Sequence, residues 1–181
     1  ADLKLVRSLH QKKYRDAEGL FLVQGPKLVA ELLASGWPVR TLYATEAMAD
    51  RMHLRDAVVL PPHELERMGT LESGNAVVAV VQRPAPPPVG AVDADELVLA
   101  LDGIADPGNL GTVLRIADWF GVRRVLCDRS SVEAFNPKCV QASMGAIFRV
   151  TVHYVDLAGE LERLRAAGAA LYLASMEGRN V

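Results

Sequence analysis

Residues 96–111 read ELVLALDGIADPGNLG, and this stretch decides the fold class. Its first six residues, 96–101, form a nearly continuous apolar run, which is typical of a strand covered on both faces in a parallel sheet. A loop with two glycines follows at 102–108, and a helix is predicted from about Asn109 to Phe120. A strand, a short loop and a helix in this order indicate an α/β fold with a parallel sheet.

The residues after this stretch repeat the alternation of strand and helix. The predicted elements are a strand at 122–127, a short helix starting at Asn136 and Pro137, an apolar β-branched segment at 148–154, a helix at 157–167 and a strand at 170–174. In open parallel sheets, ligands bind outside the carboxyl ends of the strands. The loops at 102–111 and 135–146 are therefore the first places to look for a site.

A proline-rich segment, residues 83–90, divides the chain. Prolines at this density favour an extended spacer, so neither a helix nor a central strand continues through it. The segment before it predicts strands at 19–25, 39–44, 58–60 and 76–81, and helices at 26–35 and 62–68. We expect a small βαβ-type domain over 1–83, a linker over 84–94 and a second α/β domain over 95–181.

Composition limits the class of protein. The chain has 181 residues, half of them hydrophobic, and a net charge of −2, which is a globular balance. No apolar run reaches the roughly 18 residues that a membrane helix needs, and we expect no membrane partner. Cys127 and Cys139 are too few for a disulfide framework and lack metal-site spacing, so we expect no metal and a reducing, cytoplasmic setting.

One basic cluster opens the chain: Lys4, Arg7, His10, Lys12, Lys13 and Arg15. Only Asp2 and Asp16 oppose it. Local cations of this kind can bind phosphates even when the net charge of the chain is negative. The alternative is a helix face whose charges are simply solvated.

The loop at 102–111 allows close approach to its backbone, and free N–H groups at the start of the next helix could hold a phosphate. It lacks the Gly-Lys-Ser/Thr of a P-loop and the G-x-G-x-x-G pattern. In the helix, the expected apolar stripe is Leu110, Val113, Ile116, Ala117 and Phe120. Arg115 lies about 200° from Val113 and points away from that stripe. It could bind a phosphate with two hydrogen bonds, or it could be an ordinary exposed arginine.

The loop at 135–146 reads FNPKCVQASMGA. Asn136 is a plausible N-cap, and Pro137 suits the first position of a helix. Ser143, Gly145 and Ala146 are small, which permits tight packing or a close ligand. Capping and packing alone would explain this loop.

Together these blocks resemble a known family. The stretch 102–117 resembles the first signature motif of the SpoU/TrmH RNA methyltransferases, and 136–138 with 142–146 is similar to the next conserved block of that family. Residues 8–15 and 21–25 are similar to the N-terminal substrate-binding domain of the same family. The resemblance runs over nearly the whole chain.

The resemblance implies transfer of a methyl group from S-adenosylmethionine to a ribose 2′-hydroxyl of ribosomal or transfer RNA. It also implies a catalytic domain with a trefoil knot and a homodimer. Carried onto this sequence, Asn109 and Arg115 would be catalytic. The RNA-contacting residues would be Lys12, Lys13, Arg15, Asn136, Lys138 and Ser143, and the residues that touch the methyl donor would be Ala174, Ser175 and Met176.

The sequence ends before the blocks that build the knot and the donor pocket in the family. We therefore expect an incomplete catalytic domain that binds S-adenosylmethionine poorly by itself. A non-catalytic RNA-binding protein with part of the catalytic fold is the main alternative. A domain that binds a small nucleotide at 102–111 is a weaker one.

Overall fold

The computed structural model describes residues 3–69, 75–93 and 95–174. Its N-terminal half holds a four-stranded sheet in the order β1-β4-β2-β3. The strands are β1 (Leu20–Gln24), β2 (Val39–Ala44), β3 (Val58–Val59) and β4 (Val77–Gln82). β4 pairs antiparallel with both β1 and β2, and only β2 and β3 are parallel. The strand positions were predicted, but the expectation of a βαβ-type domain was wrong because β4 returns antiparallel between β1 and β2.

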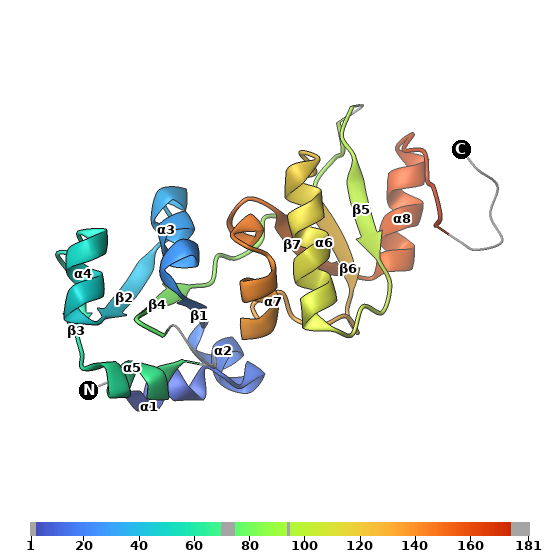
Figure 1. The fold of residues 1–181 in the computed structure, drawn as a ribbon. Helices are drawn as coiled ribbons and strands as arrows, with labels where there is room; N and C mark the ends of the chain where they lie inside the picture. Colours follow the sequence, from blue (N-terminus) through green and yellow to red (C-terminus); the bar gives the residue numbers. More distant parts are fainter. Residues whose placement is uncertain (1–2, 70–74, 94, 175–181) are drawn as a thin grey trace.

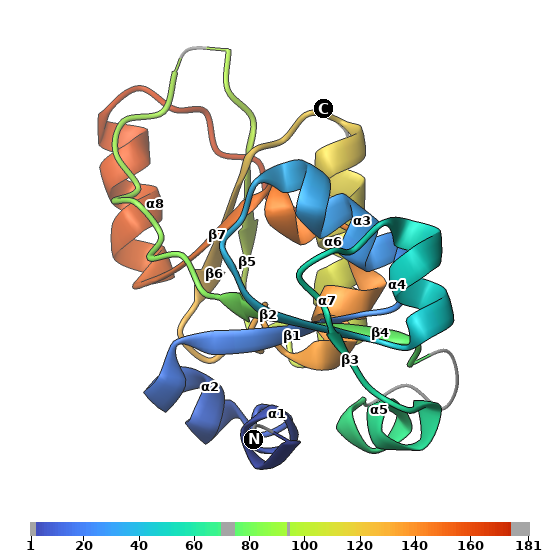
Figure 2. The same cartoon turned by 90° about the vertical axis from the view of Figure 1, so that its left-hand side faces the viewer.

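Five helices cover the two faces of this sheet (Figure 2). α3 (Pro26–Ser35) and α4 (Glu46–Met52) lie on one side, and α1 (Leu3–Ser8), α2 (Lys12–Glu18) and α5 (Pro62–Met68) lie on the other. All five residues of β1 are buried, because alternate side chains of the strand enter two different cores. Phe21 and Val23 face α3, whereas Leu20 and Leu22 face α1 and α5.

The C-terminal half is a three-stranded parallel sheet, β5-β6-β7, between two long helices (Figure 1). Its strands are β5 (Val98–Leu101), β6 (Arg124–Asp128) and β7 (Thr151–Val155). α6 (Pro107–Trp119) covers one face and α8 (Leu157–Ala166) the other. α7 (Pro137–Ala142) and the 3-10 turn η1 (Ala146–Phe148) connect β6 to β7. The prediction of an α/β fold with a parallel sheet is confirmed.

The two halves share one hydrophobic core. α7 lies between α6 and the N-terminal sheet (Figure 1), and the cluster that contains Phe21 also contains Leu110 and Cys139. The Phe21 ring centroid is 4.7 Å from that of Phe135, and the Trp37 ring is 5.4 Å from that of Phe148. Residues 83–93, which join the halves, form no helix or strand. The proline-rich segment therefore separates two stretches of sequence but not two cores.

The predicted strand at 170–174 is wrong, since these residues form no strand and pair with no described strand. Leu171, Tyr172 and Leu173 are exposed, the last by 89%. An apolar run becomes a strand only where a neighbouring strand offers backbone partners, and none of the described residues does so here. No described helix is both long enough and apolar enough to cross a membrane.

Candidate functional site

The two loops that the sequence singled out lie against each other. Asp106 caps α6 by accepting a hydrogen bond from the backbone N–H of Asn109 at Oδ1 (2.9 Å). Its other oxygen, Oδ2, accepts a hydrogen bond from Lys138 Nζ of α7 at 2.7 Å. The hydrogen bond from Lys138, followed by that from the Asn109 amide, lowers the pKa of the Asp106 carboxyl. Lys138, which was predicted to contact RNA, is thus paired with Asp106 and joins the two loops.

Asp128, at the end of β6, fixes the loop after β5. Its carboxylate accepts hydrogen bonds from the Gly103 N–H at 2.8 Å and from the Ser131 hydroxyl. Hydrogen bonds from Ser130, Ser131 and Gly103 lower the pKa of Asp128, so it stays ionised near neutral pH. Sequence reasoning missed this residue, although an aspartate and two serines after a strand are a turn signal. The loop at 102–106 is therefore held in place by the next strand of the sheet.

The exposed face of α6 carries both predicted catalytic residues. Asn109 and Arg115 are both exposed, and Arg115 makes no hydrogen bond or ion pair with any described residue. Six residues of helix separate them by about 9 Å along the axis, and they do not hydrogen-bond each other. Asn109 therefore does not hold Arg115 in place, as the sequence had suggested it could.

The buried stripe of α6 differs from the predicted one. Leu110, Gly111, Leu114 and Ala117 are buried. Ile116 and Phe120 were expected in the core, but they are exposed by 49% and 74%. The reason is that α7 packs on the face centred on Gly111, which rotates the contact away from Phe120. Arg115 lies off the core in either arrangement.

α6 and α7 pack closely because Gly111 has no side chain. A Cβ atom at this position would lie 2.6 Å from the Cys139 carbonyl oxygen and 2.7 Å from Ala142 Cβ. Ser143 lies in the same contact and is fully buried, and its hydroxyl donates to the Val140 carbonyl at 2.7 Å. The placement of Ser143 at an RNA surface is therefore wrong: it belongs to the packing of α7. Asn136 caps α7 by accepting from the Lys138 N–H at 2.9 Å.

Gly111→Ala is expected to force α6 and α7 apart and to destabilise the protein by about 1–3 kcal/mol. Its Cβ would meet backbone atoms, which cannot move aside as the end of a side chain can. Gly159→Ala is the matched control, because a Cβ there meets only the side chain of Asp156, at 3.0 Å. Thermal unfolding of both variants measures the difference. Equal unfolding temperatures would show that the contact between the helices adjusts freely.

The N-terminal basic cluster is not a single exposed face. Lys12 pairs with Asp16 at 2.5 Å, and Lys13 Nζ lies 4.7 Å from the centre of the Tyr14 ring. Arg15 is only 2% exposed, and it donates to both carboxylate oxygens of Glu133, at 3.1 and 2.7 Å. The grouping of Arg15 with RNA-binding cations is therefore corrected: this side chain ties α2 to the C-terminal half.

The predicted donor-binding residues are not brought to this edge. Ala174 is exposed in an irregular segment, and Ser175 and Met176 lie outside the described residues. The two best-formed hollows of the described chain lie elsewhere. One is a groove of 570 Å³ between α1, α2 and α5, and the other, of 170 Å³, lies by Pro88, Arg124 and His153. Within the described residues, no set can be assigned to hold S-adenosylmethionine.

Comparison with protein families accounts for both halves of the chain. Residues 1–82 match the MRM3-like substrate binding domain, and residues 96–181 match the SpoU rRNA Methylase family. The chain is 28% identical to the 23S rRNA (guanosine(2553)-2′-O)-methyltransferase RlmP of Bacillus subtilis, over 92% of this chain and 66% of that protein. It is 30% identical to the mitochondrial rRNA methyltransferase 3 of Xenopus laevis, over 82% of this chain and 38% of that protein.

Solved structures show the same relationship. A TrmH-family RNA methyltransferase from Porphyromonas gingivalis superposes with a TM-score of 0.80 at 41% identity, over 92% of this chain and 66% of that one. The SpoU methyltransferase AviRb from Streptomyces viridochromogenes, in complex with AdoMet, gives 0.79 at 29% identity, over 93% of this chain and 69% of that one. The chain thus spans about 38% and 66% of the lengths of the two curated relatives described above.

Proposed function

Since this chain belongs to the SpoU family of rRNA methyltransferases, we propose that the protein transfers a methyl group from S-adenosylmethionine to a ribose 2′-hydroxyl of ribosomal RNA. S-adenosylmethionine is the expected cofactor, because solved relatives of the family bind it. The observation that carries the proposal is Arg115: within the first motif of the matched region, it is exposed and pairs with no described residue.

The chemistry suits an arginine. A ribose hydroxyl is a weak acid, and its oxygen becomes a better nucleophile when a nearby positive charge stabilises the developing alkoxide. A guanidinium is protonated at all ordinary pH values, so Arg115 would act by its charge and its hydrogen bonds rather than by removing the proton. The same fork can hold an RNA phosphate and so orient the ribose.

We also propose that the protein works as a homodimer. The C-terminal end of α6 carries Ile116, Trp119 and Phe120, and Trp119 is 85% exposed. Apolar side chains that gather on one surface favour contact with another protein surface, and a second copy of the chain would supply one of the same composition. Sedimentation of the full-length protein at the mass of one chain would contradict the dimer.

A reducing compartment such as the cytoplasm completes the proposal. Cys127 and Cys139 are buried free thiols, and burial raises the pKa of each to about 12. Neither thiol is therefore primed to form a disulfide. Thiol titration of the unfolded native protein should find both reduced, and an oxidised pair would contradict this.

The direct test is methyl transfer by the full-length protein. Incubation with S-adenosylmethionine labelled in the methyl group and with ribosomal RNA should place label in dinucleotides that resist alkali, because alkaline cleavage of RNA needs a free 2′-hydroxyl. Label in alkali-sensitive products would indicate methylation of a base instead. Tight RNA binding without any transfer would favour the non-catalytic RNA-binding protein.

A further inference from the structure

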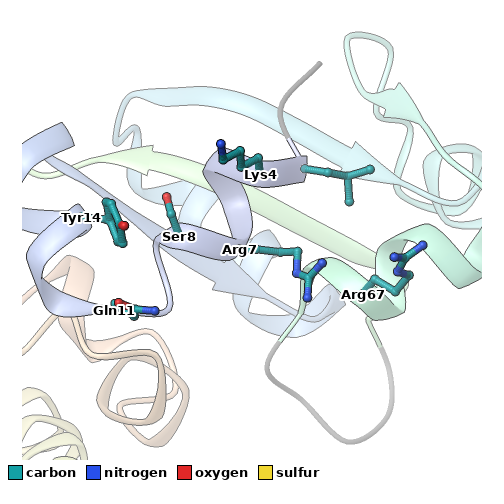
Figure 3. A pocket seen from close by; sticks show the side chains of 7 residues that line it. Lys4, Arg7, Ser8, Gln11, Tyr14 and Arg67 are labelled. Carbon is teal, nitrogen blue, oxygen red and sulfur yellow. The ribbon is translucent and has the colours of Figure 1, made fainter.

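The groove between α1, α2 and α5 is built from segments far apart in the sequence (Figure 3). It is lined by Leu3, Lys4, Arg7, Ser8, Gln11, Tyr14 and Arg67. Arg67 comes from α5, some sixty positions after Arg7, and its part in a cationic site could not be foreseen from the basic cluster at the start of the chain. The structure thus assembles a different set of cations from the one that the sequence suggested.

Two contacts fix α5 beside α1. Val6 and Leu9 pack with Leu65 and Met68 in one buried cluster, in which all four are 0% exposed. His10 Nε2 lies 2.8 Å from the Met68 carbonyl oxygen, which can only accept, so this ring nitrogen donates the hydrogen bond. Arg67, next to Met68, is therefore held at the groove by the packing of its neighbour.

The cations of the groove are free to bind a ligand. Lys4, Arg7 and Arg67 are exposed, and none of them forms an ion pair with a described residue. Lys4 and Arg7 are three residues apart on α1 and so share one face of the helix. The other cations of the original cluster are committed: Lys12 to Asp16 and Arg15 to Glu133.

The remaining lining residues favour RNA over an acidic peptide. Tyr14 is 39% exposed at the rim of the groove, and an exposed aromatic ring can stack on a base. Arginine forks match the two oxygens of a phosphate, and Ser8 and Gln11 add uncharged groups that can hydrogen-bond a ribose or a base. Cations with a ring at their edge are the usual arrangement for single-stranded nucleic acid.

We propose that this groove binds single-stranded RNA, with Lys4, Arg7 and Arg67 on successive phosphates and Tyr14 stacked on a base. The proposal rests on the proposed function for the identity of the ligand as RNA. It adds where the N-terminal half makes contact and in what form the RNA is bound.

The test is binding of a fluorescein-labelled single-stranded RNA to the full-length protein, followed by anisotropy across a salt titration. The triple variant Lys4→Ala, Arg7→Ala, Arg67→Ala should bind at least about tenfold more weakly. The slope of log K against log salt should become shallower by about 0.7 for each phosphate that is no longer neutralised, or about two units in all. The matched control replaces Arg40, Arg51 and Arg55, which are exposed and outside the groove, and it should keep most of the slope.

Tyr14 separates stacking from charge. Tyr14→Ala should weaken binding roughly tenfold while leaving the salt slope unchanged, and Tyr14→Phe should bind like the wild type. All variants should unfold at the wild-type temperature, because the altered side chains are exposed or partly exposed.

Equal losses in the groove variant and its control would show that only bulk charge matters and would overturn the groove. So would a groove variant that binds RNA normally, or one that has lost binding only to labelled polyglutamate, which would indicate an acidic peptide as ligand. A protein that binds RNA through the groove but transfers no methyl group would leave the groove standing and remove the proposed function.

Discussion

Arg115→Ala in the full-length protein is expected to lower the rate of methyl transfer by about 10²–10³-fold, the usual effect of losing one charged or hydrogen-bonding group that stabilises a transition state. Its stability should change by less than about 0.5 kcal/mol, because Arg115 is exposed and has no partner among the described residues. The measurement is the single-turnover rate with saturating RNA and S-adenosylmethionine, together with thermal unfolding.

Two further variants make the Arg115 result specific. Arg115→Lys keeps the charge but loses the planar fork, so it should recover only part of the rate. Arg123→Ala removes an exposed arginine just before β6, at the opposite end of the strands from the motif loops, and should leave the rate unchanged. A normal rate in Arg115→Ala would show that another residue activates the hydroxyl.

Glu133→Ala is expected to be the most destabilising of the substitutions considered for this chain. It would leave Arg15 buried at 2% exposure without its carboxylate partner, and Arg83, 3.6 Å from Glu133, would also lose a neighbour. Removing one partner of a buried ion pair costs about 3–5 kcal/mol, or roughly 10 °C in Tm for a chain of this size. Thermal unfolding by circular dichroism measures the loss.

The control for Glu133 is an ion pair of similar geometry in water. Glu160 accepts two hydrogen bonds from Arg163 at 2.6 and 3.1–3.2 Å, but Arg163 is 45% exposed. Glu160→Ala should therefore cost about 1 kcal/mol at most. The double variant Arg15→Met, Glu133→Leu should regain much of the stability, since an apolar pair can fill the same buried space. A Glu133→Ala protein as stable as Glu160→Ala would mean that water reaches Arg15.

The sequence predicted the strands well because their signal is local. β2 and α5 have the predicted bounds, 39–44 and 62–68, and β1 lies within the predicted 19–25. α4 was not predicted, since its seven residues are mostly polar or small, although Thr45 caps it by accepting from the Met48 N–H. A short helix of this kind is stabilised by its neighbours rather than by its own periodicity.

The errors at the site have a different origin. Arg15 and Ser143 look like surface residues in the sequence, and their burial depends on partners that local patterns do not reveal. Glu133 lies 118 residues from Arg15, and Ser143 is covered because Gly111 lets α6 approach α7. Arg67 was overlooked for the same reason, since only the packing of α5 on α1 brings it to the groove.

The core that both halves share makes folding a joint event. Pulling the halves apart would expose the contacts of Phe21 with Phe135 and of Trp37 with Phe148. An aromatic side chain buries roughly 150–250 Å², and at about 25 cal/mol per Å² its full exposure costs several kcal/mol. Neither half therefore reaches its native stability alone, and the chain should melt in a single cooperative transition. Cleavage within the proline-rich segment would leave two fragments that remain associated, because their cohesion comes from these rings and not from the covalent link.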